Sequence, residues 1–395
     1  MKIVHIMGYF VPELGYQEYY LAKAHKKMGH DVYVVASDMI YPFSNIKKMF
    51  KDIGKNIKNR KRKPGFEVID GLKVYWMPHI VEYTDFILCR NVGKVLEKIK
   101  PDIVFAHESR QGMTCQAAPY KEKLGFKLIV DQHDNYHEMP GKIKNFLRAT
   151  DYFGFRKHLI DYNFRKSDRI VAVTKRTKEF LLKTHKISPR KIEVIELGVD
   201  TDLYNYKKKG AIDLRKKLGI KNNEIVLIFS GIIFSRKNIE LLINAFYEIY
   251  NDYNLRLIIV GDGEKGYMQE LKQLARDLKL GNKIIFSGFV KKEKLPVYYS
   301  AADIGVWPGN NSVSIIEAMA CRLPIIMAHM QLPHLVSHNN GFKFLLNDKK
   351  NMKQCLIKLI KNKQLRDRMG NNSLKAVSKY YSYSIAGRKF LEAAK

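Results

Sequence analysis

The chain has 395 residues, of which 46% are hydrophobic, and it carries 70 Lys and Arg against 39 Asp and Glu, a formal net charge of +31. This apolar content argues against a disordered chain, and the length predicts two domains rather than one very large core. A charge so far from zero predicts an acidic partner, such as a nucleotide phosphate, a nucleic acid or an anionic membrane surface.

The cysteines and the N-terminal sequence indicate the cellular compartment of the protein. The four cysteines, Cys89, Cys115, Cys321 and Cys355, lie far apart and form no C-x-x-C pair, which argues against a zinc site or a disulfide framework. No apolar run reaches the roughly 18 residues needed to cross a bilayer. The first ten residues lack a basic start and a cleavage site, so they are expected to form a strand. A cytoplasmic protein is expected.

Short apolar runs alternate with helical patterns along the first half of the chain. The runs expected to be strands are KIVHIM, DVYVVAS, DIVFAH, KLIVDQH and RIVAVT. Continuous apolar strands followed by helices are typical of a parallel sheet that is covered on both faces. The sequence therefore predicts a Rossmann-like domain over residues 1–200. A basic run over residues 45–63 is expected to be an insertion, either a solvated loop or a binding surface.

A second series of strand patterns begins at Glu224 and comprises EIVLIFSG, LRLIIVGDG, KIIFSGF and DIGVWP. The break between the two series falls within residues 195–210, where turn residues and a charged run replace the strand pattern. A second Rossmann-like domain is therefore predicted over residues 201–370. The tail, residues 371–395, has a helical pattern and is expected to return to the first domain.

The segment WPGNNSVSIIEAMACRLPII begins with small polar residues and continues into a helical pattern with one acid, Glu317. Ser312 and Ser314 predict a helix start with a serine cap, and Pro324 predicts its end. Free N–H groups at a helix start attract an anion, which would place Glu317 about one turn in, beside the ligand. The alternative is an ordinary capped helix with a solvated glutamate.

Candidate site residues follow the predicted strands. Ligands of open parallel sheets bind at the carboxyl ends of the strands, and two facing domains would create a cleft there. The residues at these positions are Gly8, Gly15, His107, His133, Gly231, Gly261, Gly263, Gly288 and Pro308.

The order of these motifs resembles that of the retaining glycosyltransferases with the GT-B fold, specifically family 4 (glycosyl transferases group 1). The segments that carry the resemblance are ELGYQEYYLAKAHKKMGHDVYVVAS, VIELGVDTDLY, FSGIIFSRKNIELLINAF, LIIVGDGEKGYMQELKQLARDL, IIFSGFV and VWPGNNSVSIIEAMACRLPII. Each motif is weak alone, but six in order across both halves are specific. The resemblance implies an α/β protein with two Rossmann-like, doubly wound domains facing a central cleft and a C-terminal helix that crosses back.

The resemblance also implies roles for individual residues. The helix start would present backbone amides to the donor phosphates, and Glu317 would accept hydrogen bonds from the ribose hydroxyls. Lys237, with Arg236, would neutralise the diphosphate. The donor-binding set that the resemblance implies is Gly15, Gly231, Arg236, Lys237, Gly261, Val290, Ser312, Val313, Ser314 and Glu317.

On the acceptor side, His107 and His133 match positions that face the sugar and the acceptor in the family. They would act as positioning residues, because the leaving phosphate is thought to take the acceptor proton in such enzymes. With Lys237 and Glu317 they form the candidate catalytic set.

Two positions depart from the family pattern. Gly309 stands eight positions before Glu317, where many relatives have a glutamate that contacts the transferred sugar. Ile232 stands where the phosphate-binding arginine of the family would fall. The resemblance therefore does not identify the sugar, and it does not extend to the usual donor geometry.

The leading interpretation is a metal-independent, retaining glycosyltransferase. It would move a sugar from a UDP- or GDP-sugar to a glycan or lipid-linked acceptor, in the assembly of a glycolipid, lipopolysaccharide, capsule or other cell-surface glycan. No metal or other cofactor is expected, because the D-x-D motif Asp200–Asp202 lies in the predicted hinge. Residues 141–168 mix aromatic and basic side chains, which indicates either an interfacial helix on the inner face of the cytoplasmic membrane or an ordinary packed helix.

Two alternatives stay open. A GT-B sugar-nucleotide epimerase or phosphorylase would share the fold, although the GVDT and IIEAMA segments favour the transferase. A basic nucleic-acid-binding protein without catalysis would explain the charge, but the sequence has no zinc-finger spacing, RRM signature or repeat, so no nucleic acid is expected as a partner.

Overall fold

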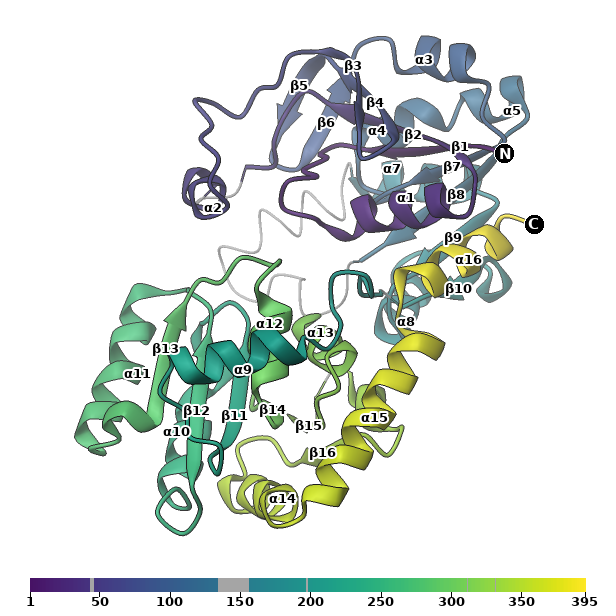
Figure 1. The fold of residues 1–395 in the computed structure, drawn as a ribbon. Coiled ribbons are helices and arrows are strands. Elements are labelled where there is room, and N and C mark those ends of the chain that lie inside the picture. The colour runs from purple at the N-terminus through teal and green to yellow at the C-terminus, as the bar shows by residue number, and fades with distance from the viewer. Residues whose placement is uncertain (43–45, 134–155, 197, 311, 331) are drawn as a thin grey trace. The chain divides into compact units, whose positions relative to one another are not determined.

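The computed structural model describes residues 1–395 except 43–45, 134–155, 197, 311 and 331. The chain divides into two compact units (Figure 1). The first unit comprises Met1–Gly198 and Tyr383–Lys395, and the second comprises Val199–Ser382. None of the described helices is both long enough and apolar enough to cross a membrane.

The described part of the first unit contains an eight-stranded sheet with the order β10-β9-β8-β7-β1-β2-β4-β3. All neighbouring strands are parallel except β3 and β4. The strands are β1 (Lys2–Met7), β2 (Asp31–Ser37), β3 (Gly65–Ile69), β4 (Leu72–Met77), β7 (Ile103–Ala106), β8 (Lys127–Gln132), β9 (Arg169–Ala172) and β10 (Ile192–Val194). Strand order reverses between β1 and β7, where a doubly wound sheet binds its ligands.

Helices cover both faces of this sheet because its central strands are apolar on both sides. On one face α3, α4, α7 and α8 pack against the sheet, and on the other α1 and the C-terminal α16 do so. The helices of this unit are α1 (Gln17–Lys27), α2 (Ile46–Asp52), α3 (Val92–Ile99), α4 (Gly112–Ala117), α5 (Tyr120–Leu124), α7 (Lys157–Lys166), α8 (Lys175–Thr184) and α16 (Tyr383–Ala393). A hairpin of β5 (His79–Tyr83) and β6 (Phe86–Cys89) lies beside them.

Two segments of the first unit were predicted with alternatives. In the basic run 45–63, α2 buries Ile46 and Phe50 against Val11 and Ile40, so this part is packed as well as charged. In residues 141–168, the described helix α7 buries Ile160 and Phe164 in the core, as an ordinary packed helix does. Residues 141–155 of that prediction lie outside the described residues.

In the second unit the described strands form a six-stranded, all-parallel sheet with the order β13-β12-β11-β14-β15-β16. In sequence order this is 3-2-1-4-5-6, the Rossmann arrangement, with its reversal between β11 and β14. The strands are β11 (Ile225–Ser230), β12 (Leu255–Val260), β13 (Ile284–Gly288), β14 (Ile304–Trp307), β15 (Ile325–Ala328) and β16 (Gly341–Phe344). The strand residues from Leu255 to Val260 are all buried, which explains their unbroken apolar character apart from Arg256.

The helices of the second unit are α9 (Lys208–Lys217), α10 (Ile239–Tyr247), α11 (Lys265–Asp277), α12 (Leu295–Ala301), α13 (Ser314–Ala320), α14 (Lys349–Lys361) and α15 (Lys363–Tyr380). The tail was expected to leave this domain at residue 371, but α15 continues to Tyr380. Its residues Met369, Ala376 and Val377 lie in the core of the second unit, so the segment that returns to the first unit begins at Tyr383.

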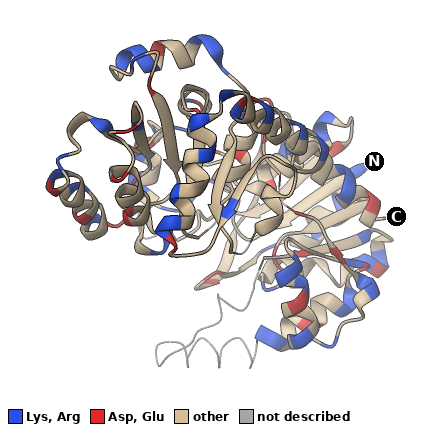
Figure 2. Ribbon diagram, turned by 90° about the horizontal axis from the view of Figure 1, so that it is seen from below, with Lys and Arg blue, Asp and Glu red and all other residues tan. Residues whose placement is uncertain are grey.

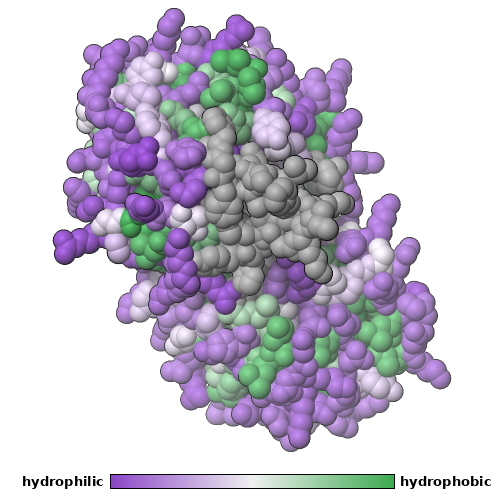
Figure 3. Space-filling view, turned by 180° about the vertical axis from the view of Figure 1, so that it is seen from behind, coloured by the Kyte–Doolittle hydropathy of each residue, from purple (hydrophilic) through white to green (hydrophobic). Residues whose placement is uncertain are grey.

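Basic side chains occur in both units. Lys and Arg lie along helices and loops throughout the ribbon (Figure 2). The face in Figure 3 is mostly hydrophilic, with apolar residues in separate patches. The charge is therefore a property of the whole surface and does not by itself mark a site.

Candidate functional site

The loops that follow β11 and β12 meet closely at the reversal point of the second sheet. Gly261 has a φ of +137°, and a Cβ atom there would lie 1.9 Å from the carbonyl oxygen of Gly231. A Cβ on Gly231 would be 3.8 Å from the hydroxyl oxygens of both Ser312 and Ser314. The structure thus brings Gly231, Gly261 and the start of α13 together, as the predicted donor-binding set requires.

The start of α13 differs from the prediction in its cap. The helix begins at Ser314, but its N-cap is Val313, and no side chain caps it. The Ser314 hydroxyl instead donates to the carbonyl oxygen of Ser230 (2.9 Å) and lies 2.6 Å from the Ser312 hydroxyl. The Trp307 indole N–H also donates to the Ser230 carbonyl (3.1 Å). A serine cap was therefore the wrong interpretation, because the Ser314 hydroxyl joins the helix to the end of β11 and the Ser312 hydroxyl bonds to Ser314.

Glu317 lies one turn into α13 and is half-buried. The Tyr299 hydroxyl donates to its Oε2 (3.0 Å), and the Ser230 hydroxyl lies 2.7 Å from the same tyrosine oxygen. Burial raises the pKa of the Glu317 carboxyl, and its hydrogen bonds to Tyr204 and Tyr299 oppose that rise. The carboxylate is thus held by aromatic hydroxyls rather than by a cation, and it is not the freely solvated glutamate of the alternative interpretation.

Lys237 is a buried cation at the same edge. It lies in a short 3-10 helix (Ser235–Lys237), and its side chain is 5% exposed. Its Nζ donates to the Asn310 carbonyl (2.7 Å) and lies 5.4 Å from the Phe234 ring centre. Burial, with a smaller contribution from Arg236, lowers the pKa of Lys237 to about 8. No carboxylate of the described chain forms an ion pair with it, so its charge is left uncompensated.

The loop that holds Lys237 is fixed to the loop after β14. The Asn310 N–H donates to the Arg236 carbonyl (2.9 Å). A Cβ on Gly309 would lie 2.3 Å from the same carbonyl oxygen. The glutamate that many relatives have at position 309 would therefore not fit without a shift of the Arg236 and Lys237 backbone.

The remaining donor-set positions of this unit are more exposed. Arg236 is exposed, and its guanidinium lies over the Phe234 ring (5.1 Å). The side chain of Ile232 is 70% exposed, so the residue in place of the family arginine makes no core contribution. Val313 is exposed and Val290 is half-buried at the edge of the core.

The first unit has its own cluster of polar residues at the reversal point of its sheet. His107 follows β7, and its Nδ1 donates to Asp131 Oδ2 (2.5 Å). His133 follows β8, and its Nε2 lies 3.6 Å from Asp131 Oδ1 and 2.5 Å from the Gln17 amide nitrogen. The backbone N–H of Glu108, a residue with a φ of +69°, donates to Asp131 Oδ1 (2.9 Å). Asp131 is thus the centre that joins both predicted histidines.

Burial and charge set the protonation states of this cluster. The two histidines hold the pKa of Asp131 well below its usual range, against the effect of its burial. Asp131 raises the pKa of His107 although burial opposes the charge. Asp131 and Glu108 raise the pKa of His133 to about 9, again against burial. The cluster therefore favours an ionised carboxylate and stabilises the charged form of both imidazoles.

The predicted site residues are divided between the units. The first unit holds Gly15, His107 and His133, and the second holds Gly231, Arg236, Lys237, Gly261, Val290, Ser312, Val313, Ser314 and Glu317. Gly15 has a φ of +67° in the turn before α1, where its N–H donates to the Pro12 carbonyl (3.1 Å).

Sequence reasoning missed Asp131, Tyr299, His5 and His25. The position of Asp131 at the end of a strand was a usable signal. The others lie inside apolar strand or helix patterns, where nothing local marks them.

In the described residues no three His, Cys, Asp or Glu side chains are placed to hold a metal ion. The Asp200 carboxylate of the D-x-D motif instead accepts the backbone N–H of Asp202 (3.1 Å), as in a local turn.

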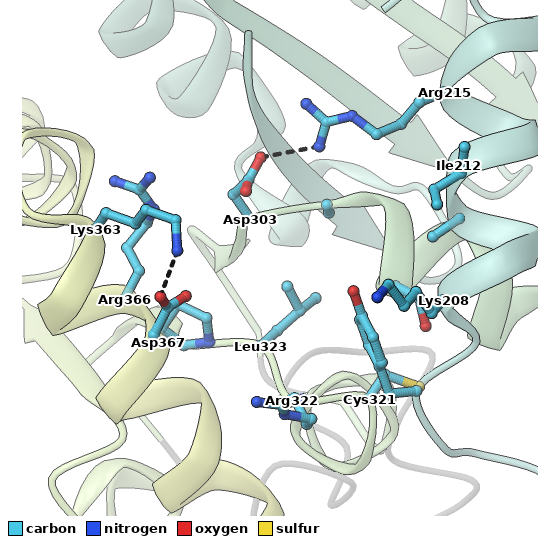
Figure 4. A pocket seen from close by; sticks show the side chains of 15 residues that line it. Lys208, Ile212, Arg215, Asp303, Cys321, Arg322, Leu323, Lys363, Arg366 and Asp367 are labelled. Carbon is cyan, nitrogen blue, oxygen red and sulfur yellow. Dashed lines mark hydrogen bonds and ion pairs between the residues drawn. The ribbon is translucent and has the colours of Figure 1, made fainter. Parts of the chain in front are cut away.

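A second concave surface lies at the opposite, amino-terminal edge of the second sheet (Figure 4). It has a volume of about 250 Å³, and its basic residues are Lys208, Arg215, Arg322, Lys363 and Arg366. Most of these cations already have partners: Arg215 pairs with Asp303 (3.2 Å), Lys363 pairs with Asp367 (2.6 Å), and Arg366 donates to the Leu359 carbonyl (2.6 Å). None of the cations of this pocket is buried as Lys237 is.

Each half of the chain matches a known protein family. The family model described as Glycosyl transferases group 1 matches residues 211–376, and the model described as Glycosyltransferase Family 4 matches residues 18–203. An uncharacterized glycosyltransferase of Methanocaldococcus jannaschii is 28% identical over 99% of this chain and 97% of its own length. The UDP-Gal:alpha-D-GlcNAc-diphosphoundecaprenol alpha-1,3-galactosyltransferase of Escherichia coli is 26% identical over 75% of this chain and 77% of its own.

The fold is also found in solved structures. HepE of Anabaena in complex with UDP has 20% sequence identity and a TM-score of 0.71, and the match covers 99% of both chains. The lipopolysaccharide glycosyltransferase WaaG has 16% identity and a TM-score of 0.64 over the full length of both chains. These likenesses confirm the predicted GT-B fold.

Proposed function

Because the chain belongs to the family 4, group 1 glycosyltransferases and is thus a nucleotide-sugar glycosyltransferase, we propose that its donor is a UDP-sugar and that transfer retains the anomeric configuration without a metal. UDP is the nucleotide of the HepE complex and of the Escherichia coli relative's donor. The family assignment also decides against a basic nucleic-acid-binding protein without catalysis.

The observation that carries the proposal is the buried ammonium of Lys237. Breaking the bond between sugar and phosphate leaves negative charge on the departing nucleoside diphosphate, and a fixed cation in a desolvated position stabilises that charge. Lys237 is held by Asn310 and by the Phe234 ring, so it would not need to reorganise during the reaction. In this role the lysine replaces both a metal ion and the arginine that is absent at position 232.

Glu317 would bind the nucleoside, and the α13 start would bind the phosphates. A carboxylate accepts two hydroxyl hydrogen bonds. The Tyr299 hydroxyl, which is itself hydrogen-bonded to the Ser230 hydroxyl, holds this carboxylate in place. The Ser312 and Ser314 hydroxyls lie beside Gly231, where the loop has no side chain to block a diphosphate.

For the acceptor we propose a lipid-linked sugar at an anionic membrane, in the assembly of a glycolipid or cell-surface glycan. The Escherichia coli relative acts on a sugar linked to diphosphoundecaprenol. In this chain α2 buries Ile46 and Phe50 and exposes Lys47, Lys48 and Lys51, an arrangement suited to an anionic surface. His107 and His133 would position the sugar and the acceptor.

A nucleotide panel tests the proposal. UDP and a UDP-sugar should raise the melting temperature, because a ligand that binds only the folded protein stabilises it, whereas GDP and ADP should have much less effect. Transfer from the best donor to a polyprenyl diphosphate-linked acceptor should continue in EDTA, and NMR of the product should show the donor's anomeric configuration. Stabilisation by GDP alone, inversion, or loss of transfer in EDTA would each overturn the corresponding part. Epimerisation of the free nucleotide sugar without transfer would favour the epimerase alternative.

A further inference from the structure

Three buried histidines and Asp131 form one continuous chain through the first unit. His107 Nδ1 lies 2.5 Å from Asp131 Oδ2, and His107 Nε2 lies 2.9 Å from His5 Nδ1. His5 Nε2 lies 3.0 Å from His25 Nδ1, and His25 Nε2 lies 2.9 Å from the Gly387 carbonyl oxygen. The exposed fractions of the three imidazoles and the carboxylate are between 0% and 3%, so water does not complete these bonds. We refer to this set as the histidine chain.

The histidine chain crosses the unit from one layer to the next. Its members belong to the ends of β8 and β7, to β1, to α1 and to the C-terminal α16. The His5 and His107 rings are 7° from parallel with centres 5.2 Å apart, which with the 2.9 Å contact is the geometry of coplanar rings joined end to end. The Phe105 ring lies beside His5 and His25 (5.4 and 5.0 Å) and shields the bonds from solvent.

With Asp131 ionised, as its lowered pKa favours, counting protons shows that the histidine chain cannot be neutral at every imidazole. Its two ends, the Asp131 carboxylate and the Gly387 carbonyl, are both acceptors. Four contacts therefore need four protons, one in each gap, whereas three neutral imidazoles supply only three. With three protons, one buried gap would hold two lone pairs facing each other, which costs as much as an unsatisfied buried hydrogen bond.

The surroundings locate the fourth proton on His107. His107 touches Asp131 directly, and Glu18 of α1 adds to the effect that raises its pKa, while His133 and burial oppose it. Burial lowers the pKa of His5, with contributions of the same sign from His25 and His107, against Asp131. For His25, burial lowers the pKa to about 4, with His30 and His107 acting in the same sense and the Gly387 carbonyl opposing. With His107 as imidazolium, His5 and His25 each carry their single proton on Nε2, and every contact has one donor and one acceptor.

We propose that His5 and His25 are positioning residues: they keep His107 as an imidazolium paired with ionised Asp131, and they tie this charge pair to the carbonyl of Gly387 in α16. The trapped proton neutralises the carboxylate that aligns the Glu108 backbone and His133. A charge pair leaves less net charge beside His107 and His133 than a lone buried carboxylate would. The link to sugar transfer rests on the proposed function, but the proton count does not.

Gly387 allows α16 to pack closely on α1 at the hydrogen bond between His25 and the Gly387 carbonyl. A Cβ at this position would lie 3.2 Å from the Ala24 Cβ and 3.3 Å from the His25 ring, so a glycine lets α16 approach α1. Glycine in the middle of a helix costs ~1 kcal/mol relative to alanine. The cost is offset by a contact that brings a backbone carbonyl within hydrogen-bond distance of a buried imidazole.

Two variants of His25 distinguish a proton requirement from simple packing. His25→Gln keeps all four contacts and the four protons that they need, because the carboxamide oxygen can accept from His5 and its NH₂ can donate to Gly387. His25→Leu removes two contacts, and the two that remain need only two protons, which neutral His5 and His107 supply. The leucine variant should therefore lower the pKa of His107 by about 1 to 2 units, the equivalent of one unsatisfied buried hydrogen bond, and the glutamine variant should not.

The readout is the ¹⁵N chemical shift of the imidazoles in the full chain labelled with [¹⁵N]histidine, followed against pH without any donor. In the parent, the assigned signals of the histidine chain should show His107 with protons on both nitrogens at pH 7 and His5 and His25 as Nε2–H tautomers. In His25→Gln, His107 should stay doubly protonated and His5 should stay an Nε2–H tautomer. In His25→Leu, the doubly protonated ring should lose its second proton at lower pH. Neutral rings at all three of His5, His25 and His107 in the parent at pH 7 would overturn the proposal, and this measurement needs no variant to fold.

Activity separates this proposal from the proposed function. The alkaline limb of kcat against pH should move to lower pH in His25→Leu and stay in place in His25→Gln, with little change in KM for the donor. Spectra as expected with no sugar transfer by the parent would refute the function and leave the histidine chain intact. Normal transfer with identical pH profiles and spectra in both variants would refute the histidine chain and leave the function intact.

Discussion

Replacing Lys237 by methionine should make the protein more stable and a weaker binder of its donor. Burial lowers the pKa of this lysine from its usual 10.5 to about 8. A pKa difference of this size means that keeping the ammonium protonated in the folded protein costs about 3 kcal/mol below pH 8. Methionine has a similar length and no charge, so Lys237→Met removes this cost. The loss of the hydrogen bond to Asn310 offsets part of the gain, about 1 kcal/mol.

The sign of the pH dependence gives an independent check. Since the unfolded chain binds more protons than the folded chain between about pH 8 and 10.5, the stability of the parent should rise with pH across this window. The methionine variant should lose this particular rise. The free energy of unfolding is measured by urea denaturation from pH 7 to 10.5, with Arg236→Met as the matched control. Arg236 is the neighbouring cation but is exposed, so its removal should change stability by less than about 0.5 kcal/mol.

Binding should change in the opposite direction to stability. A charged hydrogen bond to a diphosphate is worth roughly 1.5 to 3 kcal/mol, so Lys237→Met should weaken UDP binding about ten- to a hundredfold by calorimetry. A variant that is less stable than the parent and binds UDP equally well would refute both the uncompensated burial of the lysine and its role in donor binding.

Three further predictions concern other parts of the molecule. Glu317→Ala should raise KM for the donor about tenfold or more, because the hydroxyl hydrogen bonds to a carboxylate are lost, and unchanged kcat/KM would contradict the assignment. Gly261→Ala should destabilise the fold by at least about 3 kcal/mol in thermal unfolding, since its Cβ would lie 1.9 Å from a carbonyl oxygen and its φ is positive. Gly266→Ala is the control: the space around its Cβ is open, so this variant should be neutral or slightly stabilised. Replacing four lysines of the basic run by glutamine should cut binding to anionic vesicles at least about tenfold in a sedimentation assay, with zwitterionic vesicles as the control and UDP binding unchanged; equal vesicle binding would remove this run from the membrane proposal. The four lysines are Lys47, Lys48, Lys51 and Lys55.

Local sequence predicted those features whose cause is local. Unbroken apolar runs predicted the strands because both faces of each central strand are covered, as Leu255–Val260 shows. Gly231 and Gly261 were predicted as site residues at the ends of β11 and β12, and in the structure a Cβ on Gly261 would lie 1.9 Å from the Gly231 carbonyl oxygen. Motif order predicted the fold and family because a GT-B chain presents its loops in a fixed sequence.

Features that depend on long-range contacts were missed or misassigned. The hydroxyl of Ser314 was expected to cap its own helix, but the carbonyl of Ser230, 84 positions earlier, competes successfully for it. His5 and His25 lie inside a strand and a helix whose patterns explain them as core residues. Their partners are 102 and 362 positions away, so only the strand order and the seating of α16 bring the histidine chain together.

The buried charge of the first unit has a carboxylate partner, whereas that of the second unit has none among the described residues. This difference indicates a different role for each charge. In the first unit the imidazolium of His107 has a carboxylate at one nitrogen and an imidazole acceptor at the other, so its burial is compensated within the protein. Such a group is held in one state and one orientation, which suits a residue that positions others. In the second unit Lys237 has a carbonyl oxygen and no carboxylate partner among the described residues, and it keeps a cost of about 3 kcal/mol in the free protein. An anion bound there would stabilise the buried ammonium. The free energy that its burial costs in the free protein would therefore add to the affinity for a diphosphate.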